Sequence, residues 1–363
     1  MSRLRRAAIH VLVAGRLSDR RGFLRLTPWT GRFMFSAAVI VFALAAGATY
    51  QAVGTRRSRL RYAPPGRLLD VAGETLHVVC AGQGHRPVLF EAGIGASSLS
   101  WTTVMREAAH FTSVCAYDRA GLGWSEPARS PRTIERILDE LRGVLTVTAG
   151  SAPAVLVGHS FGAFLSLLYA SRRPADIAAL VLVDPPTEWQ RMTPRQARML
   201  WGAIQLSHFG GVLARFGVVR ASLALLTGGA PGVPQRGVRV FGPAVARTLE
   251  HLVGEVRKLP ADVHPFVQAQ WCQPKCFRAM ADYLAALRET AAAAAQGIDL
   301  GDIPLVVVSG GDQPAEILAE HGRLAGLSRR GRHIVAAHSG HWVQLDRPDV
   351  VIATIRELVE GLL

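Results

Sequence analysis

The stretch Ala154–Phe164, "AVLVGHSFGAF", decides how this chain folds. Its first part is a short apolar run typical of a buried strand, and apolar residues at helical spacing follow it. Between them, Gly158 and Gly162 flank Ser160, and glycines at these places permit a turn in which side chains would otherwise collide. The sequence therefore predicts a strand, a sharp turn with a serine hydroxyl at its tip, and a helix that begins at Phe161.

Strand-like runs alternate with helical periodicity on both sides of this turn. Several of the runs are continuous in Val, Ile and Leu, as expected for parallel strands that are covered on both faces. Such alternation is typical of a doubly wound α/β domain. The predicted strands are residues 67–71, 75–81, 86–92, 111–118, 154–159, 178–184, 303–310 and 332–338. The predicted helices are residues 99–109, 133–148, 161–172, 313–328 and 348–362.

One long interval breaks the alternation. Over residues 187–298 the chain shows helical periodicity and no strand-like run. An insertion of this length at the edge of a sheet is expected to form a helical cap, and the core then consists of residues 67–186 and 299–363. The predicted cap helices are residues 194–209, 211–227, 243–258 and 277–296.

The positive charge of the chain is concentrated at its N-terminus. The 363 residues carry a formal net charge of +14. Residues 1–67 hold thirteen arginines and one acidic residue, Asp19, whereas the remainder is nearly neutral. This distribution disfavours a nucleic-acid-binding globular domain, and it favours arginines that set membrane topology over the alternative, a tail over residues 1–67 that binds nucleic acid. We therefore expect no nucleic-acid partner, and we assign the arginines to a basic tail over residues 1–32 and a linker over 56–66.

An uncharged apolar segment, residues 33–55, separates the basic tail from the linker. As a helix it would extend over roughly 34 Å, which is enough to cross the hydrocarbon core of a bilayer. Arginines are more numerous before it than after it, which favours a single-pass membrane anchor with the globular domain outside the cytoplasm. A cleaved export signal is the alternative, because small residues at 43–48 could serve a signal peptidase and "RRGFLR" at 20–25 resembles a twin-arginine motif. A buried helix is the third interpretation.

Gly158, Ser160 and Gly162 form a Gly-x-Ser-x-Gly pattern between a strand and a helix, as in a nucleophile elbow. With this pattern and three further motifs, the chain resembles the α/β-hydrolase superfamily over roughly residues 67–363. The further motifs are "YDRAGLGWSEP" at 117–127, "LVDPP" at 182–186 and "SGHWVQLDRP" at 339–348. The resemblance implies a mostly parallel eight-stranded sheet with helices on both faces and an inserted helical cap. Within the superfamily, the chain resembles uncharacterised bacterial hydrolases with one N-terminal membrane helix.

A serine hydroxyl is a weak nucleophile at neutral pH and needs a base within hydrogen-bond reach. The superfamily's chain order of serine, acid and histidine places that base after the last strand, which makes His341 the candidate. His338 lies three residues earlier and is the competitor. We interpret His159 as a bystander packed beside Ser160. A serine that only caps the following helix is the alternative interpretation of Ser160.

The histidine in turn needs a carboxylate that fixes its tautomer and stabilises its charged form. Asp312 follows the seventh predicted strand, where the superfamily usually places its acid, and is our first choice. Its register is imperfect, because counting three residues from the strand-ending Gly310 gives Gln313. Asp184, at the end of the sixth predicted strand, is the alternative acid.

Acyl transfer also needs donors for the oxyanion of the tetrahedral intermediate. One is expected to be the backbone N–H of Phe161, the residue after the serine. The other is expected to be the N–H of Ile94, in "EAGIGASS" after the third predicted strand. Superfamily members usually have His-Gly in that loop, whereas this chain has Ala-Gly at 92–93, a difference that removes no backbone donor. The resemblance implies that the charges of Asp118 and Arg119 hold a loop and do not act on substrate.

With the resemblance, these residues predict a serine hydrolase that cleaves a carboxylic ester or related acyl bond through an acyl-enzyme, with no metal or organic cofactor. The predicted cap is rich in Leu, Val, Ala, Phe and Trp, which favours a small apolar acyl substrate. A serine at the elbow disfavours the dehalogenase and epoxide hydrolase branches, which use aspartate there. The alternatives are an acyltransferase and a membrane-tethered domain that binds a ligand or partner without catalysis.

Four cysteines are too few for a disulfide scaffold, and no histidine lies at zinc-finger spacing from them. The resemblance places Cys80 and Cys115 on neighbouring strands, so a disulfide between them is expected if the domain is exported. Cys272 and Cys276 are four residues apart. They are expected either to form a local bridge or to serve as small buried apolar residues.

Overall fold

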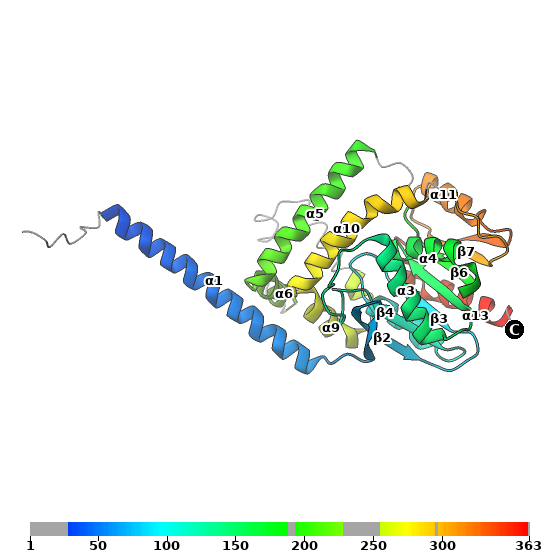
Figure 1. Cartoon of the computed structure of the whole chain (residues 1–363), viewed down its shortest axis with the longest axis horizontal. Helices are drawn as coiled ribbons and strands as arrows, with labels where there is room; N and C mark the ends of the chain where they lie inside the picture. Colours follow the sequence, from blue (N-terminus) through cyan, green and yellow to red (C-terminus); the bar gives the residue numbers. More distant parts are fainter. Residues whose placement is uncertain (1–27, 188–192, 228–254, 295–296, 362–363) are drawn as a thin grey trace, which may run out of the picture. The chain divides into compact units, whose positions relative to one another are not determined.

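Eight strands pair into one sheet in the computed structural model of the protein (Figure 1). The strands are β1 (Arg67–Val71), β2 (Glu74–Ala81), β3 (Val88–Glu91), β4 (Val114–Asp118), β5 (Ala154–His159), β6 (Ile177–Val183), β7 (Leu305–Gly310) and β8 (Gly331–Ala336). Their order across the sheet is β1-β2-β4-β3-β5-β6-β7-β8. The pairings of β2 with β1 and with β4 are antiparallel, and all the others are parallel. The mostly parallel eight-stranded sheet expected from the sequence is confirmed.

The structure describes residues 28–187, 193–227, 255–294 and 297–361. Most of the predicted basic tail, the motif at 20–25 and most of the predicted helix 243–258 lie outside the described residues. The chain divides into two compact units, Met1–Ala46 and Gly47–Leu363. The second unit contains both the sheet and the cap.

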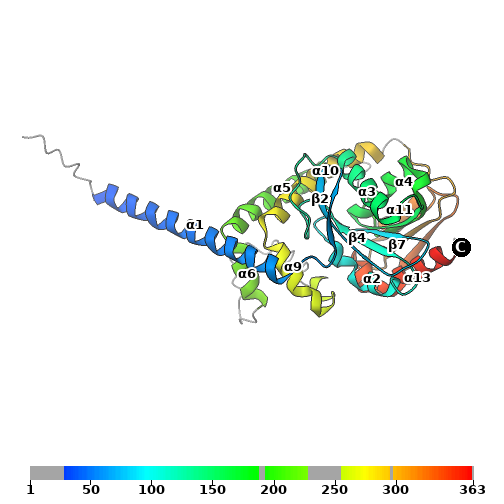
Figure 2. The same cartoon turned by 60° about the horizontal axis from the view of Figure 1, so that its bottom comes forward.

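Both faces of the sheet are covered by helices, because alternate strand residues point to opposite sides. The helices of the core are α2 (Thr102–Ala108), α3 (Ile134–Ala149), α4 (Phe161–Arg172), α11 (Ala315–Ala325), the short α12 (Val343–Asp346) and α13 (Pro348–Gly361). On one face, Leu156 and Leu180 pack with residues of α3, α4 and α11. On the other, Val155 and Val181 pack with residues of α2 and α13. Figure 2 shows the two helical layers on either side of the strands.

The turn between β5 and α4 holds Ser160 in a left-handed backbone conformation, with a φ of 52°. Residues other than glycine adopt such a φ only where their surroundings enforce it. A Cβ at Gly158 would lie 2.5 Å from the carbonyl oxygen of Gly162, and a Cβ at Gly162 would lie 2.4 Å from that of Glu91. Both glycines are therefore required by the close approach of backbone. The predicted sharp turn is present, and α4 begins at Phe161.

The cap lies between β6 and β7 and is helical, as the sequence predicts. Its described helices are α5 (Pro194–Arg215), α6 (Val218–Thr227), α9 (His264–Trp271) and α10 (Pro274–Ala294), with the 3-10 turn η3 (Ala261–Val263). The predicted helix break at residue 210 is wrong, because α5 continues through Gly210, which is packed against Phe277 of α10. The sequence analysis missed α9, whose Pro265 stands in the first turn, where its missing N–H costs nothing.

The N-terminal helix α1 (Pro28–Arg61) is longer than the predicted apolar segment. It includes residues 56–61, which the sequence analysis assigned to a linker. Arginine and leucine favour helix in this stretch, and no proline interrupts it before residue 64. Among the described residues, Arg32–Arg61 is the one helix that is long and apolar enough to cross a membrane.

The last part of α1, residues 47–61, is bonded to the cap. The buried side chain of Gln51 donates to the carbonyl of Cys272 at 2.9 Å and accepts from Arg220 Nε at 3.0 Å. Arg220 also donates to Ser58 Oγ at 3.2 Å. These bonds explain why the helix does not give way to a linker at residue 56.

Cys80 of β2 and Cys115 of β4 stand opposite each other in register and are joined by a disulfide. Cys272 and Cys276 are free thiols, each donating to a backbone carbonyl of α9. Burial raises the pKa of Cys276 to about 12. The expected bridge between strands is present, and of the two interpretations of the other pair the structure has the unbridged one.

Gly162→Ala is expected to lower the free energy of unfolding by about 1–3 kcal/mol, because the added methyl group must displace the backbone of Glu91 and Ala92. Gly202→Ala on α5 is the control, since nothing lies within 4 Å of its Cβ. Alanine in a helix interior is more stable than glycine by about 0.5–1 kcal/mol. Urea unfolding of the full chain in detergent measures both variants, and equal stability would contradict the tight packing at Gly162.

Candidate active site

Ser160, His341 and Asp184 form a continuous hydrogen-bonded chain at the ends of β5 and β6 and in the loop after β8. His341 Nε2 lies 3.0 Å from Ser160 Oγ, and His341 Nδ1 lies 2.6 Å from Asp184 Oδ2. Because a carboxylate only accepts hydrogen bonds, Nδ1 carries the ring proton and Nε2 is free to accept the hydroxyl proton. This tautomer is the one that a general base for serine requires.

Asp312, the first-choice acid of the sequence analysis, is not the carboxylate that His341 binds. Its side chain is exposed, and its backbone N–H donates to the carbonyl of Ser339 at 3.0 Å. The chain turns at Gly311 directly after β7 and leaves Asp312 at the surface. The choice is therefore corrected to the alternative, Asp184, which the structure places against His341.

Asp184 is buried and held on several sides. The N–H of Gly310 donates to its Oδ1 at 2.9 Å, and Gln313 Nε2 donates to its Oδ2. Its own N–H donates to the carbonyl of Val308 at 2.7 Å, which fixes a backbone with a φ of 42°. Gln313 stands where the register count would put the acid, and from there it supports the carboxylate of the neighbouring strand.

A second polar chain supports the residue after Asp184. Ser309 Oγ lies 2.6 Å from both His321 Nδ1 and His333 Nε2, and His321 Nε2 lies 2.7 Å from the carbonyl of Pro185. The carbonyl only accepts, so His321 carries its proton on Nε2 and the Ser309 hydroxyl donates to Nδ1. Burial lowers the pKa of His321 and keeps this arrangement neutral. The sequence analysis singled out none of these three side chains.

His159 fixes the loop that carries His341. Its Nε2 donates to the backbone carbonyl of His341 at 2.9 Å, and its ring centroid lies 4.8 Å from that of Trp342. Burial, together with the nearby His341, lowers the pKa of His159 well below its usual value, so the ring is neutral. Its other nitrogen faces Gly93, where a Cβ would lie 2.8 Å away. The interpretation of His159 as a bystander is therefore incomplete, because its ring lies between the loop of His341 and the turn of Gly93, two segments that are far apart in sequence.

His338, the competing base, is exposed in the turn after β8, with a φ of 58°. The N–H of Gly340 donates to Asp346 Oδ2 at 3.0 Å and closes the following turn. His341, and not His338, is the histidine that this loop brings to Ser160.

Two backbone segments meet at the serine: the start of α4 and the turn after β3. Phe161 is the first residue of α4, so its N–H has no partner within the helix. Ile94 lies in a turn closed by the bond from the N–H of Ala96 to the carbonyl of Gly93, at 3.2 Å. A Cβ at Gly93 would lie 3.5 Å from Ser160 Cβ, which shows how near this turn is to the serine.

The buried guanidinium of Arg119 holds the turn after β3. It donates to the carbonyls of Ala92 at 2.6 Å and Gly93 at 2.5 Å, and it pairs with Glu91. In a trans peptide the N–H points opposite to the carbonyl, so binding the carbonyl of Gly93 directs the N–H of Ile94 away from Arg119. Burial opposes the charge of Arg119, but Glu91, Tyr283 and Tyr117 together raise its pKa above the usual value.

Aromatic rings enclose the same guanidinium. Its carbon lies 5.4 Å from the ring centroid of Phe161 and 5.1 Å from that of Tyr283, which is a residue of α10. The Tyr283 hydroxyl donates to the carbonyl of Ala120 at 3.0 Å. The cap therefore contributes directly to the packing around the turn after β3.

Asp118 organises a neighbouring loop. Its carboxylate accepts from the N–H groups of Ser98 at 2.7 Å and Trp124 at 2.9 Å, and it lies 2.9 Å from His77 Nδ1. Burial opposes the carboxylate charge, but the hydrogen bond from His77 and the two amides together lower its pKa. These contacts fit the loop-holding role that the resemblance implies for Asp118.

Curated relatives share limited stretches with this chain. The uncharacterized protein YqjL of Bacillus subtilis is 37% identical over 98 residues, which cover 27% of this chain and 39% of that protein. The 2-(acetamidomethylene)succinate hydrolase of Mesorhizobium japonicum is 27% identical over 176 residues, which cover 48% of this chain and 59% of that protein. The chain thus spans less than two thirds of the length of these relatives.

Solved structures share the fold at low sequence identity. A thermophilic esterase from Thermogutta terrifontis matches with a TM-score of 0.56 and 18% identity, over 82% of this chain and 99% of that one. The Cif epoxide hydrolase from Acinetobacter nosocomialis matches with a TM-score of 0.63 and 16% identity, over 86% of this chain and 96% of that one. Residues 85–354, well over half of the chain, match the Alpha/beta hydrolase family, to which this protein therefore belongs.

Proposed function

We propose that this protein is a serine hydrolase that cleaves a carboxylic ester or a related acyl bond. The observation that carries the proposal is the chain from Ser160 through His341 to Asp184, with 3.0 Å between Ser160 Oγ and His341 Nε2. A hydroxyl at the tip of a sharp turn beside a correctly protonated histidine supports a covalent acyl-enzyme. Membership of a hydrolase family supports hydrolysis as the outcome.

In the first half-reaction, Ser160 Oγ attacks the substrate carbonyl carbon while His341 Nε2 takes the hydroxyl proton. The carboxylate of Asp184 stabilises the imidazolium that forms. The N–H groups of Phe161 and Ile94 donate to the oxyanion of the tetrahedral intermediate. His341 then gives its proton to the leaving oxygen, the bond between the carbonyl carbon and that oxygen breaks, and the acyl group remains on Ser160.

Water completes the second half-reaction. His341 takes a proton from water as the water oxygen attacks the acyl carbon, and collapse of this intermediate returns the proton to Ser160 Oγ and frees the acid. An acyltransferase would use an alcohol in place of water at the same step. The non-catalytic alternative draws on the imperfect register of Asp312 and on the missing histidine of the loop after β3, and the contact of Asp184 with His341 weakens the first of these supports.

We further propose that α1 anchors the protein in a membrane and that the catalytic domain lies outside the cytoplasm. The length and composition of Arg32–Arg61 support the anchor. The disulfide between Cys80 and Cys115 supports the location, because disulfides persist in oxidising compartments. A domain at the membrane surface would meet small apolar acyl substrates that partition into lipid.

Ser160→Ala is expected to abolish labelling by a fluorophosphonate probe and to lower the turnover of p-nitrophenyl esters by at least about 1,000-fold, because the nucleophile is lost. Assays with esters of increasing acyl length would also rank the apolar preference. Ser309→Ala is the matched control, since Ser309 is a buried serine that also contacts histidines. Labelling that survives in Ser160→Ala but not in Ser309→Ala would refute the assignment.

Asp184→Asn is expected to lower kcat for the best ester by about 10³- to 10⁴-fold, because the amide no longer fixes the tautomer of His341. Asp312→Asn is the matched control and is expected to change kcat by less than about twofold, since its side chain is exposed. Steady-state kinetics of the two folded variants distinguish Asp184 from Asp312 as the acid. A large loss in Asp312→Asn with none in Asp184→Asn would restore the first choice of acid.

Arg119→Lys is expected to lower kcat by about 10- to 100-fold with little change in KM, because an ammonium cannot hold the carbonyls of Ala92 and Gly93 together. The rate of fluorophosphonate labelling should fall in parallel. Arg132→Lys is the matched control: Arg132 is also buried and also lies over Tyr283, but it pairs with Glu140. Equal losses in the two variants would indicate a general effect on packing and would contradict a positioning role for Arg119.

A further inference from the structure

The cap exposes a concentration of large apolar side chains, which we call the cap face. Its members are Met199, Trp201, Leu206, Phe209, Val212, Val218 and Leu225, all on α5 and α6. Trp201 is 63% exposed and Phe209 is 55% exposed. Elsewhere among the described residues of the unit Gly47–Leu363, large apolar side chains are exposed only at Tyr50, Val53, Leu60, Leu68, Val147 and Val335. The cap face is therefore a local feature and not a general property of the surface.

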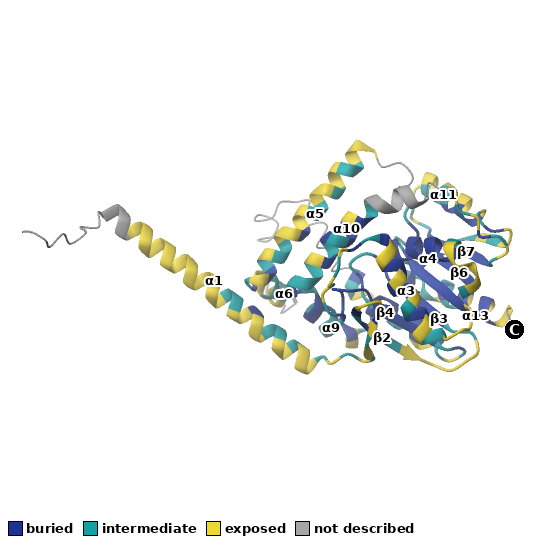
Figure 3. Ribbon diagram, viewed as in Figure 1, coloured by how far each residue is buried: buried dark blue, intermediate teal, exposed yellow. Residues whose placement is uncertain are grey.

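Helix α5 carries large apolar side chains on its exposed side as well as on its half-buried side. Its buried and half-buried positions include the small residues Ala203, Ser207, Gly210 and Ala214 at helical spacing, and Gly210 packs against Phe277 of α10. The large apolar residues of α5 in the cap face are exposed, whereas Leu200, Ile204 and Leu213 are half-buried, and Figure 3 colours much of α5 as exposed. A helix in water buries its large apolar residues. Small residues at the helix–helix contact and large ones outside are the arrangement found where lipid surrounds a helix.

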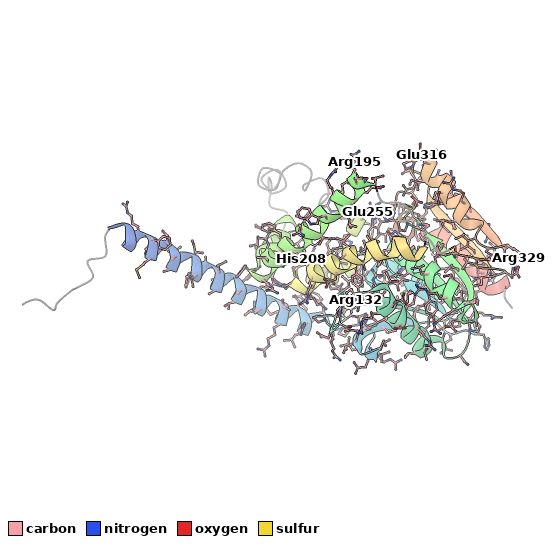
Figure 4. All side chains as sticks on the ribbon, turned by 45° about the horizontal axis from the view of Figure 1, so that its top comes forward. Arg132, Arg195, His208, Glu255, Glu316 and Arg329 are labelled. Atoms are coloured by element: carbon pink, nitrogen blue, oxygen red, sulfur yellow. A yellow bond between two sulfur atoms is a disulfide. The ribbon has the colours of Figure 1, made fainter. Side chains whose placement is uncertain are left out.

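The charge of the same region is entirely positive. Residues 193–227 contain four arginines and no aspartate or glutamate. Arg195 and His208 are among the polar side chains interspersed with the apolar ones on α5 (Figure 4). The adjoining residues 47–61 of α1 add four more arginines, again with no acidic residue. Aromatic and aliphatic side chains mixed with arginine fit the interface of a bilayer that contains anionic phospholipid.

The cap face is continuous with the end of the apolar segment. A Cβ at Gly47 would lie 2.5 Å from the carbonyl oxygen of Phe216, and a Cβ at Gly217 would lie 2.6 Å from the ring of Tyr50. The turn between α5 and α6 thus touches residues 47–50, which belong to the predicted anchor of residues 33–55. The turn therefore lies beside the last part of the apolar segment.

We propose that the cap face lies on the bilayer and that its partner is anionic phospholipid. The proposal rests on the proposed anchoring by α1 and adds a second contact, made by the catalytic unit itself. The cap would then lie between the bilayer and the candidate active site, since α10 packs against α5 and its own residue Tyr283 lies beside Arg119. A second copy of the chain is the other occupant that such a surface could have, and the experiment separates the two.

The test uses the full chain in nanodiscs of phosphatidylcholine and phosphatidylglycerol, with an environment-sensitive NBD label on one introduced cysteine. Phe209→Cys reports the cap face, and Leu206→Cys is a second position on it. Val147→Cys is the matched control, because Val147 is 52% exposed on α3. Val41→Cys reports the anchor. The unmodified chain, whose native thiols are buried or half-buried, gives the background labelling.

Lipid brominated near the carbonyl end of its acyl chains is expected to quench the label at Phe209 and Leu206, lipid brominated near the chain ends is expected to quench the label at Val41, and both are expected to leave the label at Val147 unchanged. Replacing the phosphatidylglycerol by phosphatidylcholine is expected to weaken the quenching at Phe209 but not at Val41. These readouts need no enzymatic activity, so they stand apart from the proposed hydrolysis.

Three outcomes would overturn the proposal. Quenching at Val41 without quenching at Phe209 and Leu206 would leave the anchor in place and remove the cap contact. A blue shift at Phe209 that bromine does not quench would show that a second copy, and not lipid, covers the face. No quenching at Val41 would refute the anchoring on which the proposal rests.

Discussion

The site depends on how closely the start of α4 approaches the end of β3. A Cβ at Gly162 would lie 2.4 Å from the carbonyl oxygen of Glu91 and 2.5 Å from that of Ala92. Adjacent parallel strands end at the same edge of a sheet, so this contact sets the serine beside the turn that carries Ile94. The strained φ of Ser160 persists because rigid backbone on both sides leaves it no alternative. The proposed nucleophile and oxyanion donors are thus positioned by one packing constraint.

The proposed acid has to meet a different requirement, because its carboxylate only needs to lie within hydrogen-bond distance of His341 Nδ1. β6 lies between β5 and β7, so a carboxylate at the end of either β6 or β7 comes near the loop after β8. Here the end of β6 supplies it, and the residue at the other place, Gln313, is a neutral donor to Asp184. A second carboxylate there would have repelled the first. An acid after β6, Asp184, and an amide after β7, Gln313, can therefore lie side by side without charge repulsion.

Local patterns predicted most of the fold and, of the three residues in the hydrogen-bonded chain, Ser160 and His341 as first choices. Apolar runs predict the eight strands, and glycine spacing predicts the turn at Ser160. Chain order predicts the position of His341. The acid did not follow, because the choice between Asp184 and Asp312 is made by how the turn after β7 packs. Local patterns also did not predict the contact of His159, because the carbonyl that it binds, that of His341, is far away in sequence. Helix α5 passes the predicted break only because α10 covers Gly210.

Helix α10 connects the outside of the cap to the catalytic turn. Phe277 packs against Gly210 of α5, and two turns along the same helix Tyr283 lies over the guanidinium of Arg119. That guanidinium holds the carbonyl of Gly93 and so the direction of the neighbouring N–H. A helix transmits displacement along its length because its backbone hydrogen bonds resist deformation. Whatever fixes α5 from outside therefore also restrains the turn that carries Ile94, and a bilayer against the cap face would make the order of the proposed oxyanion donors depend on membrane contact.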